Sequence, residues 1–474
     1  ALLVSSGTSF STNGGTIRFN LARDAGASAS TVSTISVPAG FAFNNVEMNG
    51  NAPHYAFFDD VNSSTTLVVN GNLVFAGKRN NANWDVLGNI TVNGYANSGT
   101  GTIRAAGSTN QTVTGTSTAW FSDFAIASTG GIVTLAGTLS FSRNFTYTSG
   151  TVDAGTSTVS FYAETGYTNV LTPGVMTFNN VKFDGYTGAF TLTGTMDVAG
   201  TLSLASITSS PPASINTGTV LARGPISCTN YGVTGTGLIK VGGNSNQTVS
   251  GTSGVNIPNF EIASTGGTVT YSGTLNFIKS YTHTSGTVDA GTSTVQLATG
   301  NTSSQTFVPG ATVFNNLILG GYNTVYTMTG TATANGTLTF NSYTGSPAAS
   351  YNSGAIVAKG NVVFSTYGAL GNVTLSYEGS TNTTLSLSGS VSKPTGLVTV
   401  NKSGGAKVTL LTNYALSAAG QDLNVSGGTF DLGGYTLTIP DVITVGAGAT
   451  LKCSGGTFSS ASVANSGVIN CPGY

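Results

Sequence analysis

Residues 148–159 read TSGTVDAGTSTV, and the same letters return unchanged at residues 284–295. Other blocks repeat at the same offset of 136 residues. For example, FAIASTGG at 124–131 matches FEIASTGG at 260–267. A fixed period of this kind indicates a repeat architecture in which each unit packs on the next.

The repeat divides the chain into five segments. Divergent units at the two ends are typical of such arrays, because an end unit must cover an open face. We expect an N-terminal strand or cap, exchangeable between subunits, at 1–42, a partial first repeat at 43–106, full repeats at 107–242 and 243–378, and a divergent repeat with a C-terminal cap at 379–474.

Short stretches within each copy alternate apolar residues with Thr or Ser. Residues 132–141 (IVTLAGTLSF) show this period of two, which is typical of strands and not of helices. Gly and Asn separate these stretches at short intervals. The pattern predicts an all-β chain, namely a parallel β-solenoid (β-helix) built from imperfect repeats of about 136 residues, with coils of roughly 20 residues. Tandem β-sandwich domains are the alternative.

The composition excludes several classes of partner. Only 7% of the 474 residues are charged and the formal net charge is −1, whereas soluble domains average about 25% charged residues. Such a chain cannot neutralise a phosphate backbone, so no nucleic-acid partner is expected. No run approaches the roughly 18 apolar residues of a membrane-spanning helix, so no transmembrane segment is expected.

The strand and turn blocks resemble those of a known class of surface proteins. Residues 314–319 (FNNLIL), followed by a Gly-rich turn, and residues 426–439 (SGGTFDLGGYTLTI) are similar to β-solenoid repeats of large prokaryotic cell-surface proteins of the filamentous-haemagglutinin-like and autotransporter-passenger-like kinds. The resemblance covers most of residues 43–440. It implies a secreted, surface-exposed scaffold and no particular chemistry.

Candidates for catalysis are few. Asp59, Asp60, Lys78 and Arg79 could form a carboxylate–cation cluster if a coil brings them together, as glycosidases and lyases require. A solvated polar loop is the favoured interpretation of these residues. We therefore expect no enzymatic activity, with a polysaccharide-degrading enzyme as the least favoured alternative.

The two histidines give no sign of a metal or cofactor site. His54 has no His or Cys nearby in the sequence, and His283 occupies the place that Tyr147 holds in the preceding copy. A metal ligand or a catalytic base would not be exchanged for Tyr. No catalytic, metal-binding or cofactor-binding residue is therefore predicted.

Some polar residues recur at the repeat offset, which favours structural roles. Asp153 recurs as Asp289, in a Val-Asp-Ala-Gly context that suits an Asp bonded to its own turn. Arg104, Arg143 and Arg223 likewise recur as Lys240, Lys279 and Lys359.

The three cysteines have different predicted roles: one is expected at a buried apolar position, and the other two are expected to form a disulfide. Cys228 matches Phe364 in the next copy, which predicts a buried apolar position. Cys453 and Cys471 lie close to each other in the sequence, and we expect them to form a disulfide that pins the last coil of a secreted chain.

Sequons of the Asn-x-Ser/Thr kind lie beside predicted turns, where glycans could be attached to a secreted chain. The candidates are Asn62, Asn89, Asn110, Asn144, Asn246, Asn301, Asn335, Asn372, Asn382, Asn401 and Asn424.

The favoured function is that of an extracellular structural protein, secreted or on the cell surface, that assembles with copies of itself into a filament, sheath or layer. A net charge near zero removes self-repulsion, and uncharged strand edges are templates for another chain. The apolar N-terminal segment, with Leu2, Leu3, Val4 and Phe10, is the candidate subunit-contact strand. An adhesin or carbohydrate-binding stalk, with surface glycans as partners, is the alternative.

Overall fold

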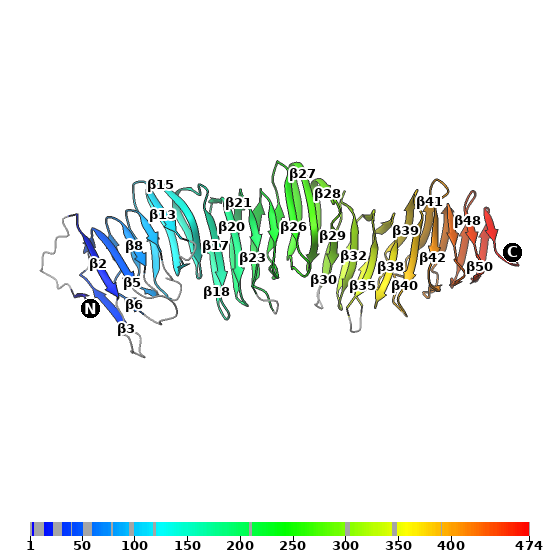
Figure 1. Cartoon of the computed structure of the whole chain (residues 1–474), viewed down its shortest axis with the longest axis horizontal. Coiled ribbons are helices and arrows are strands. Elements are labelled where there is room, and N and C mark those ends of the chain that lie inside the picture. The colour runs from blue at the N-terminus through cyan, green and yellow to red at the C-terminus, as the bar shows by residue number, and fades with distance from the viewer. Residues whose placement is uncertain are drawn as a thin grey trace. The chain divides into compact units, whose positions relative to one another are not determined.

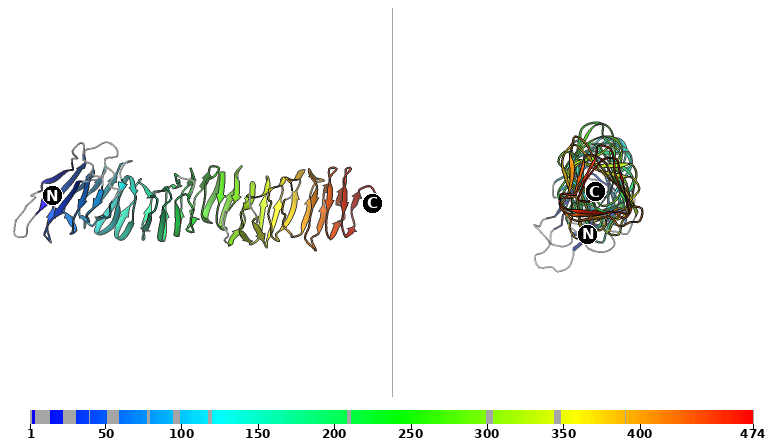
Figure 2. Two further views of the ribbon diagram at one scale, coloured as in Figure 1. Left: turned by 90° about the horizontal axis from the view of Figure 1, so that it is seen from below. Right: turned by 90° about the vertical axis from the view of Figure 1, so that its right-hand side faces the viewer.

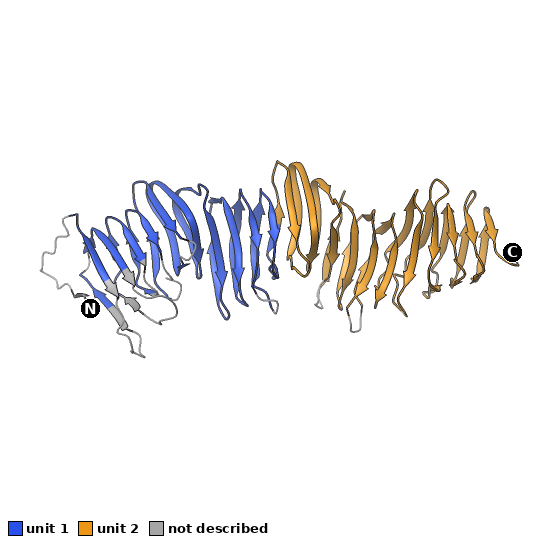
Figure 3. Cartoon of the chain, viewed as in Figure 1, with its two compact units in different colours: residues 1–239 blue, residues 240–474 orange. Residues whose placement is uncertain are grey.

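The computed structural model shows an all-β chain with strands numbered β1 to β51 and no helix among the residues that it describes (Figure 1). The chain divides into two compact units, residues 1–239 and residues 240–474 (Figure 3). The described residues are 2–3, 14–21, 31–38, 40–50, 59–76, 79–93, 99–116, 120–207, 211–298, 304–343, 348–389 and 391–473.

Each unit is a parallel β-solenoid, as the sequence predicts. A strand pairs in parallel with the matching strand of the next coil, so that successive coils stack within each unit (Figures 1 and 2). In unit 1 the longest strand, β15 (Asp123–Phe141), pairs in this way with β17 (Thr158–Ala163). The alternative of tandem sandwiches is wrong, because sandwiches are built from antiparallel sheets.

One ladder of unit 1 carries the candidate site described below. Its interior side chains are stacked in register, and Phe141, Phe161 and Phe183 are fully buried. Cys228 is the register partner of Leu204 and is a buried free thiol, which confirms its predicted apolar position. The ladder runs through β14 (Trp120–Phe121), β15, β17, β20 (Asn180–Gly185), β22 (Leu202–Leu204) and β24 (Ile226–Cys228).

Unit 2 continues the same plan within its own coils. Leu317, Leu338 and Val362 are partners on successive coils and are fully buried. The matching ladder runs through β27 (Asn259–Phe277), β29 (Thr294–Leu297), β32 (Asn316–Gly321), β35 (Leu338–Ser342), β38 (Val362–Thr366), β40 (Thr383–Leu387), β42 (Lys407–Leu410), β45 (Thr429–Asp431), β48 (Thr450–Lys452) and β51 (Val468–Asn470).

Asn side chains join neighbouring coils through their carbonyl oxygens. Oδ1 of Asn45 accepts the backbone N–H of Asn72, Oδ1 of Asn72 accepts that of Asn89, and Oδ1 of Asn89 accepts that of Thr112. The donors and acceptors are 27, 17 and 23 residues apart, so the coil length varies around the expected value. These bonds satisfy backbone donors at the corners of the coils, which would otherwise need water.

Residues at the 136-residue offset make the same contacts in the two full copies. The Ser128 hydroxyl donates to the Gly107 carbonyl at 2.9 Å, and Ser264 does the same to Gly243 at 2.8 Å. The glycines that turn the long strands also match, since Gly131 and Gly267 have φ of 68° and 67°. Side chains other than Gly rarely adopt this conformation.

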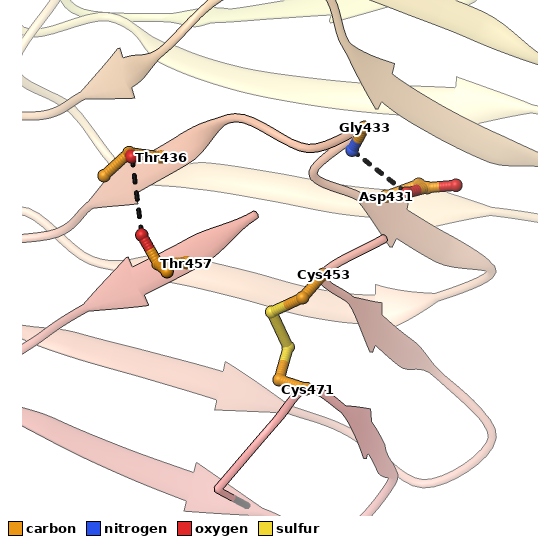
Figure 4. Close-up of a disulfide and its surroundings, with 6 residues drawn as sticks. All are labelled: Asp431, Gly433, Thr436, Cys453, Thr457 and Cys471. Carbon is orange, nitrogen blue, oxygen red and sulfur yellow. Dashed lines mark hydrogen bonds between the residues drawn. A yellow bond between two sulfur atoms is a disulfide. The ribbon is translucent and has the colours of Figure 1, made fainter. Parts of the chain in front are cut away.

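The recurring Asp residues bond to their own turns, as predicted. Oδ1 of Asp153 accepts the N–H of Gly155 at 2.9 Å, and Oδ1 of Asp289 accepts that of Gly291 at 2.9 Å. Asp431 makes the equivalent bond to Gly433 in the divergent repeat (Figure 4).

Several charged residues form ion pairs between coils. Such half-exposed pairs contribute little to stability, typically about 0–1 kcal/mol. The pairs outside the candidate site are Arg18 with Glu47, Arg104 with Asp85, Arg223 with Asp197, Lys240 with Glu261, and both Lys407 and Lys452 with Asp431.

Cys453 and Cys471 form a disulfide in unit 2 (Figure 4). The bond links the segment after β48 to the segment after β51, so it ties together two successive coils. At the other end of the chain, β1 (Leu2–Leu3) pairs in parallel with β3 (Thr31–Ser36) of the same chain. Val4 and Phe10 lie outside the described residues, and a contact of this strand with another subunit stays a prediction.

Candidate functional site

The two full copies differ most in chemistry at one place in unit 1. There Trp120, Tyr162, Lys182 and Asp184 stand where the second copy has the uncharged residues Asn256, Ala298, Ile318 and Gly320. Together with their neighbours they form what we call the aromatic–charged cluster. It consists of Trp120, Arg143, Tyr162, Glu164, Tyr167, Lys182, Asp184 and Tyr186.

The ladder register places the cluster on neighbouring coils. Tyr162 of β17 is the partner of Asp184 of β20. Trp120 of β14 is the partner of Ser140, which is the partner of Ser160 on the next coil. One coil lies between the coils of Trp120 and Tyr162, and its residue next to Trp120 is Ser140. Because Ser140 is small, the rings of Trp120 and Tyr162 can approach each other over it.

The aromatic rings of the cluster form a continuous group. The ring centroids of Trp120 and Tyr162 are 4.6 Å apart with an interplanar angle of 84°, and those of Tyr162 and Tyr186 are 5.9 Å apart at 87°. This edge-to-face arrangement is one of the two that aromatic pairs favour. Tyr186 is 40% exposed, so the group reaches the surface.

Each cation of the cluster is paired with a carboxylate. The Lys182 ammonium contacts the Asp184 carboxylate, and Nη1 of Arg143 donates to Oε2 of Glu164 at 3.1 Å. The Arg143 guanidinium also lies 3.7 Å from the centroid of the Tyr167 ring, a cation–π contact. The cluster is therefore rich in charged groups but close to neutral overall.

The Tyr162 hydroxyl lies in the field of both carboxylates. Burial raises its pKa well above the usual value for Tyr, and the hydrogen bond with Tyr186 and the negative charges of Asp184 and Glu164 raise it further. The raised pKa keeps the Tyr162 hydroxyl protonated, and this hydroxyl is hydrogen-bonded to Tyr186. The arrangement thus brings rings, hydroxyls, carboxylates and two cations together in one cluster.

The earlier carboxylate candidates lie elsewhere in unit 1. Asp60, in β6 (Asp59–Asn62), is the register partner of Arg79 in β9 (Arg79–Asn81), and Asp59 is the partner of Thr31. Lys78 lies outside the described residues. Asp59, Asp60 and Arg79 thus lie in paired strands and not in the expected polar loop, and the absence of a catalytic role stays a prediction. Among the described residues, no group of three or more His, Cys, Asp or Glu could hold a metal ion.

His283 belongs to a buried hydrogen-bond chain in unit 2. Its Nδ1 is 2.7 Å from Oγ1 of Thr312, and its Nε2 is 3.0 Å from the carbonyl oxygen of Gly286. In the first copy the hydroxyl of Tyr147 donates to the carbonyl of Gly150, the position that matches Gly286. His283 thus makes a packing contact equivalent to that of Tyr147. His54 lies outside the described residues.

The sequon asparagines often serve the coil-to-coil ladder. Oδ1 of each of these side chains accepts a backbone N–H from another coil: Asn89, Asn110, Asn144, Asn246, Asn372 and Asn382. Asn335 and Asn401 are exposed and Asn424 is half-buried, whereas Asn301 lies outside the described residues and the side chain of Asn62 is not described. Glycosylation of any of them stays a prediction.

No protein-family description, curated protein or solved structure matches the chain. The resemblance to prokaryotic surface solenoids stays a prediction on the sequence blocks alone. In the part of the chain that the structure describes, no helix has the length and apolarity needed to cross a membrane.

Sequence reasoning missed the aromatic–charged cluster, although a signal was present. The 136-residue offset identifies the residues that recur between the copies. Trp120, Tyr162, Lys182 and Asp184 of the cluster are replaced by residues of different chemistry. The substitution of Asn256 for Trp120 and Ala298 for Tyr162 between otherwise similar copies was that signal. The ring contacts themselves depend on which coil positions are paired.

Proposed function

We propose that the chain is an extracellular β-solenoid scaffold that binds a carbohydrate at the aromatic–charged cluster of unit 1. One observation carries this proposal: Trp120, Tyr162, Lys182 and Asp184 have no chemical counterpart in the second copy, although Arg143 and Tyr186 recur there as Lys279 and Tyr322. A side-chain set that the fold required would be expected in both. In the second copy Ile318 lies in β32, Ala298 directly follows β29, and Asn256 precedes Ile257, which forms a single bridge to Phe277.

The chemistry of the cluster suits a sugar. A pyranose ring has an apolar C–H face that packs on aromatic rings, and hydroxyls that bond to donors and acceptors at its edge. Trp120, Tyr162 and Tyr186 supply rings, and the partly exposed Glu164 supplies an acceptor, whereas Asp184 is buried and bonded to Lys182 and to the N–H of Gly185. Because Arg143 and Lys182 are already paired with carboxylates, the cluster favours a neutral sugar over a phosphate.

An extracellular location is supported by the disulfide between Cys453 and Cys471. Disulfides persist in oxidising compartments and are rare in the cytosol of mesophiles. A protein outside the cell can reach surface glycans, so an extracellular location is consistent with a carbohydrate ligand.

A glycan array followed by calorimetry on each hit tests the proposal. Trp120→Asn and Tyr162→Ala introduce residues of the matching positions in the second copy, so the fold should tolerate them. We expect each variant to weaken binding about 2- to 13-fold, since an aromatic contact contributes about 0.5–1.5 kcal/mol beyond area burial.

The matched control is Tyr435→Ala, which removes a tyrosine that is 39% exposed in unit 2, outside the cluster. Its affinity should equal that of the unaltered chain. An array without hits, or equal affinities for all variants, would refute the proposal. Cleavage of a bound glycan would instead identify an enzyme.

Self-assembly is a second candidate, and partly exposed apolar side chains in unit 2 favour it. Val463 and Ile469 are only half-buried, whereas their partners Ile443 and Leu451 on the preceding coil are fully buried. A formal net charge of −1 leaves little repulsion between copies, and we propose a second copy packed on these side chains.

Sedimentation velocity over a range of concentrations tests this candidate. We expect association that Ile469→Lys abolishes, because Lys places a charge among these half-buried apolar side chains. Val468→Lys is the matched control, since Val468 is 55% exposed and adjacent side chains of a strand point to opposite faces. A monomer at every concentration would contradict self-assembly.

A further inference from the structure

Two tyrosines of the aromatic–charged cluster lie on neighbouring coils and are in contact. Tyr162 is in β17, and Tyr186 directly follows the last residue of β20, the strand with which β17 pairs. Their ring centroids are 5.9 Å apart, and their hydroxyls are hydrogen-bonded to each other. The hydrogen bond keeps the hydroxyl ends of the two rings together. Two phenols couple at the carbons next to their hydroxyls, so this is the end of each ring at which a covalent bond would form.

An oxidant in solution can reach this pair through Tyr186. The Tyr186 side chain is 40% exposed, and Tyr162 is half-buried. In unit 2, Tyr326 and Tyr351 are also in ring contact, with centroids 4.8 Å apart, but both are fully buried. The pair of unit 1 therefore combines ring contact with access to solvent, which the buried pair lacks.

The fold does not require the pair. In the second copy Tyr322 matches Tyr186 and is 37% exposed, but Ala298 stands in the place of Tyr162. Tyr322 thus has a similar exposure without a second phenol at the matching position. The second copy therefore supplies a control for the reactivity of a single exposed tyrosine.

The location proposed for the chain is one in which tyrosines meet oxidants. The disulfide between Cys453 and Cys471 is a product of oxidation and is typical of an oxidising compartment. Hydrogen peroxide and the haem peroxidases that use it are oxidants of that compartment class. The same surroundings that keep the disulfide formed are therefore compatible with oxidation of an exposed phenol.

The coupling of two tyrosines balances with hydrogen peroxide as the oxidant. Each phenol gives up one electron and the proton of its hydroxyl, so two phenoxyl radicals form. The radicals join through a carbon–carbon bond between the ring positions next to the oxygens. The hydrogen atoms of these two carbons then move to the oxygens and restore both phenols. The two electrons and two protons that were released reduce one hydrogen peroxide to two water molecules.

We infer that Tyr162 and Tyr186 form an oxidative cross-linking site, at which hydrogen peroxide and a haem peroxidase join the two rings into dityrosine. The cross-link ties the coil of β17 to that of β20, as the disulfide ties two coils of unit 2. A covalent link of this kind also restricts the unfolded chain. The inference does not rest on carbohydrate binding, because it needs only the two tyrosines and the oxidant.

Peptide mass spectrometry after mild oxidation tests the inference. The full chain is treated with hydrogen peroxide and a haem peroxidase at low protein concentration, which keeps coupling within one chain, and is then digested with trypsin. Cleavage after Arg143, Lys182 and Arg223 places the two tyrosines in different peptides, residues 144–182 and 183–223. We expect these two peptides to appear joined, with the loss of two hydrogen atoms, together with the fluorescence of dityrosine.

Tyr162→Phe and Tyr186→Phe should each abolish the joined peptide, because each removes one phenol and keeps an aromatic ring in place. Tyr322→Phe is the matched control and should leave the yield of the joined peptide unchanged. Circular dichroism of each variant shows that it is folded.

Three results would overturn the inference. One is an unaltered chain that yields no joined peptide, and another is oxygen added to Trp120 in place of the cross-link. The third is a joined peptide that persists in Tyr162→Phe, since residues 144–182 also contain Tyr147 and Tyr167. None of these results bears on carbohydrate binding, which is measured without an oxidant.

Discussion

A buried hydrogen-bond chain distinguishes the core of unit 2 from that of unit 1. The hydroxyls of Tyr271 and Tyr281 are 2.9 Å apart, and that of Tyr281 is 3.0 Å from Oγ1 of Thr312, which also contacts His283. Burial raises the pKa of Tyr281 to about 12, so its hydroxyl stays protonated. We predict that Tyr281→Phe destabilises unit 2, because it removes the central member of this chain.

The magnitude follows from the partners left behind. Tyr271 is 2% exposed and Thr312 is 2% exposed, so water cannot replace the lost hydroxyl without rearrangement. A buried polar group that loses its partner costs about 1–3 kcal/mol. In unit 1 the matching residues are Leu135, Phe145 and Met176.

The same positions supply a compensated variant. Tyr271→Leu, Tyr281→Phe, Thr312→Met and His283→Tyr together convert the chain of bonds into the set that packs in unit 1. This fourfold variant should be more stable than Tyr281→Phe alone, because no buried hydroxyl of the chain is left without a partner. Such non-additivity is expected for residues in one network.

Hydrogen exchange by mass spectrometry measures the effect locally. Peptides from β27 and β28 (Tyr281–Asp289) should exchange about 5- to 150-fold faster in Tyr281→Phe, which corresponds to about 1–3 kcal/mol. Peptides from β15 and β16 (Phe145–Asp153) of unit 1 are the internal control and should not change. Unchanged exchange in β27, or a fourfold variant less stable than the single one, would refute the reasoning.

Three further predictions concern unit 2 and the coil-to-coil ladder. Burial lowers the pKa of Lys402 from 10.5 to about 8. Between these pH values the unfolded chain holds a proton that the folded chain has lost, so the free energy of unfolding should rise by about 2 kcal/mol from pH 8 to pH 10. In urea titrations, Lys402→Met should remove that rise, and an equal rise in both proteins would contradict the assignment. Replacing Cys453 and Cys471 by Ser should lower the stability of the last coils by about 3 kcal/mol, seen as faster hydrogen exchange confined to residues after 430; unchanged exchange there would count against a stabilising disulfide. Asn110→Ala should cost about 1 kcal/mol in urea unfolding, since its Oδ1 accepts the N–H of Ile132 at 3.0 Å, whereas Asn110→Asp should retain most of the stability; equal losses in both would show that the acceptor oxygen is not what matters.

Much of the fold could be predicted from the sequence because its determinants are local. The alternation in residues 132–141 specifies a strand with one buried face, and β15 has that pattern. The Asp153 turn bond involves residues two positions apart, and the buried environment of Cys228 follows from its match to Phe364. Each of these inferences rests either on residues close together in the sequence or on a comparison of matching positions in the two repeat copies.

The candidate site could not be predicted in the same way because it depends on register. Trp120 and Tyr162 are 42 positions apart, and they meet only because the intervening coil places Ser140 next to Trp120. Coil lengths vary, so the sequence does not state which residues of successive coils are partners.

Tryptophan fluorescence during titration with an array-identified glycan tests the central claim most directly. Trp84 is fully buried in unit 1, whereas Trp120 is half-buried in the cluster, so a glycan bound there should change the emission of Trp120. We predict a saturable change in the unaltered chain and none in Tyr162→Ala at the same concentrations. An identical saturable change in both proteins, or a spectrum that never responds while calorimetry reports binding, would contradict carbohydrate binding at the aromatic–charged cluster.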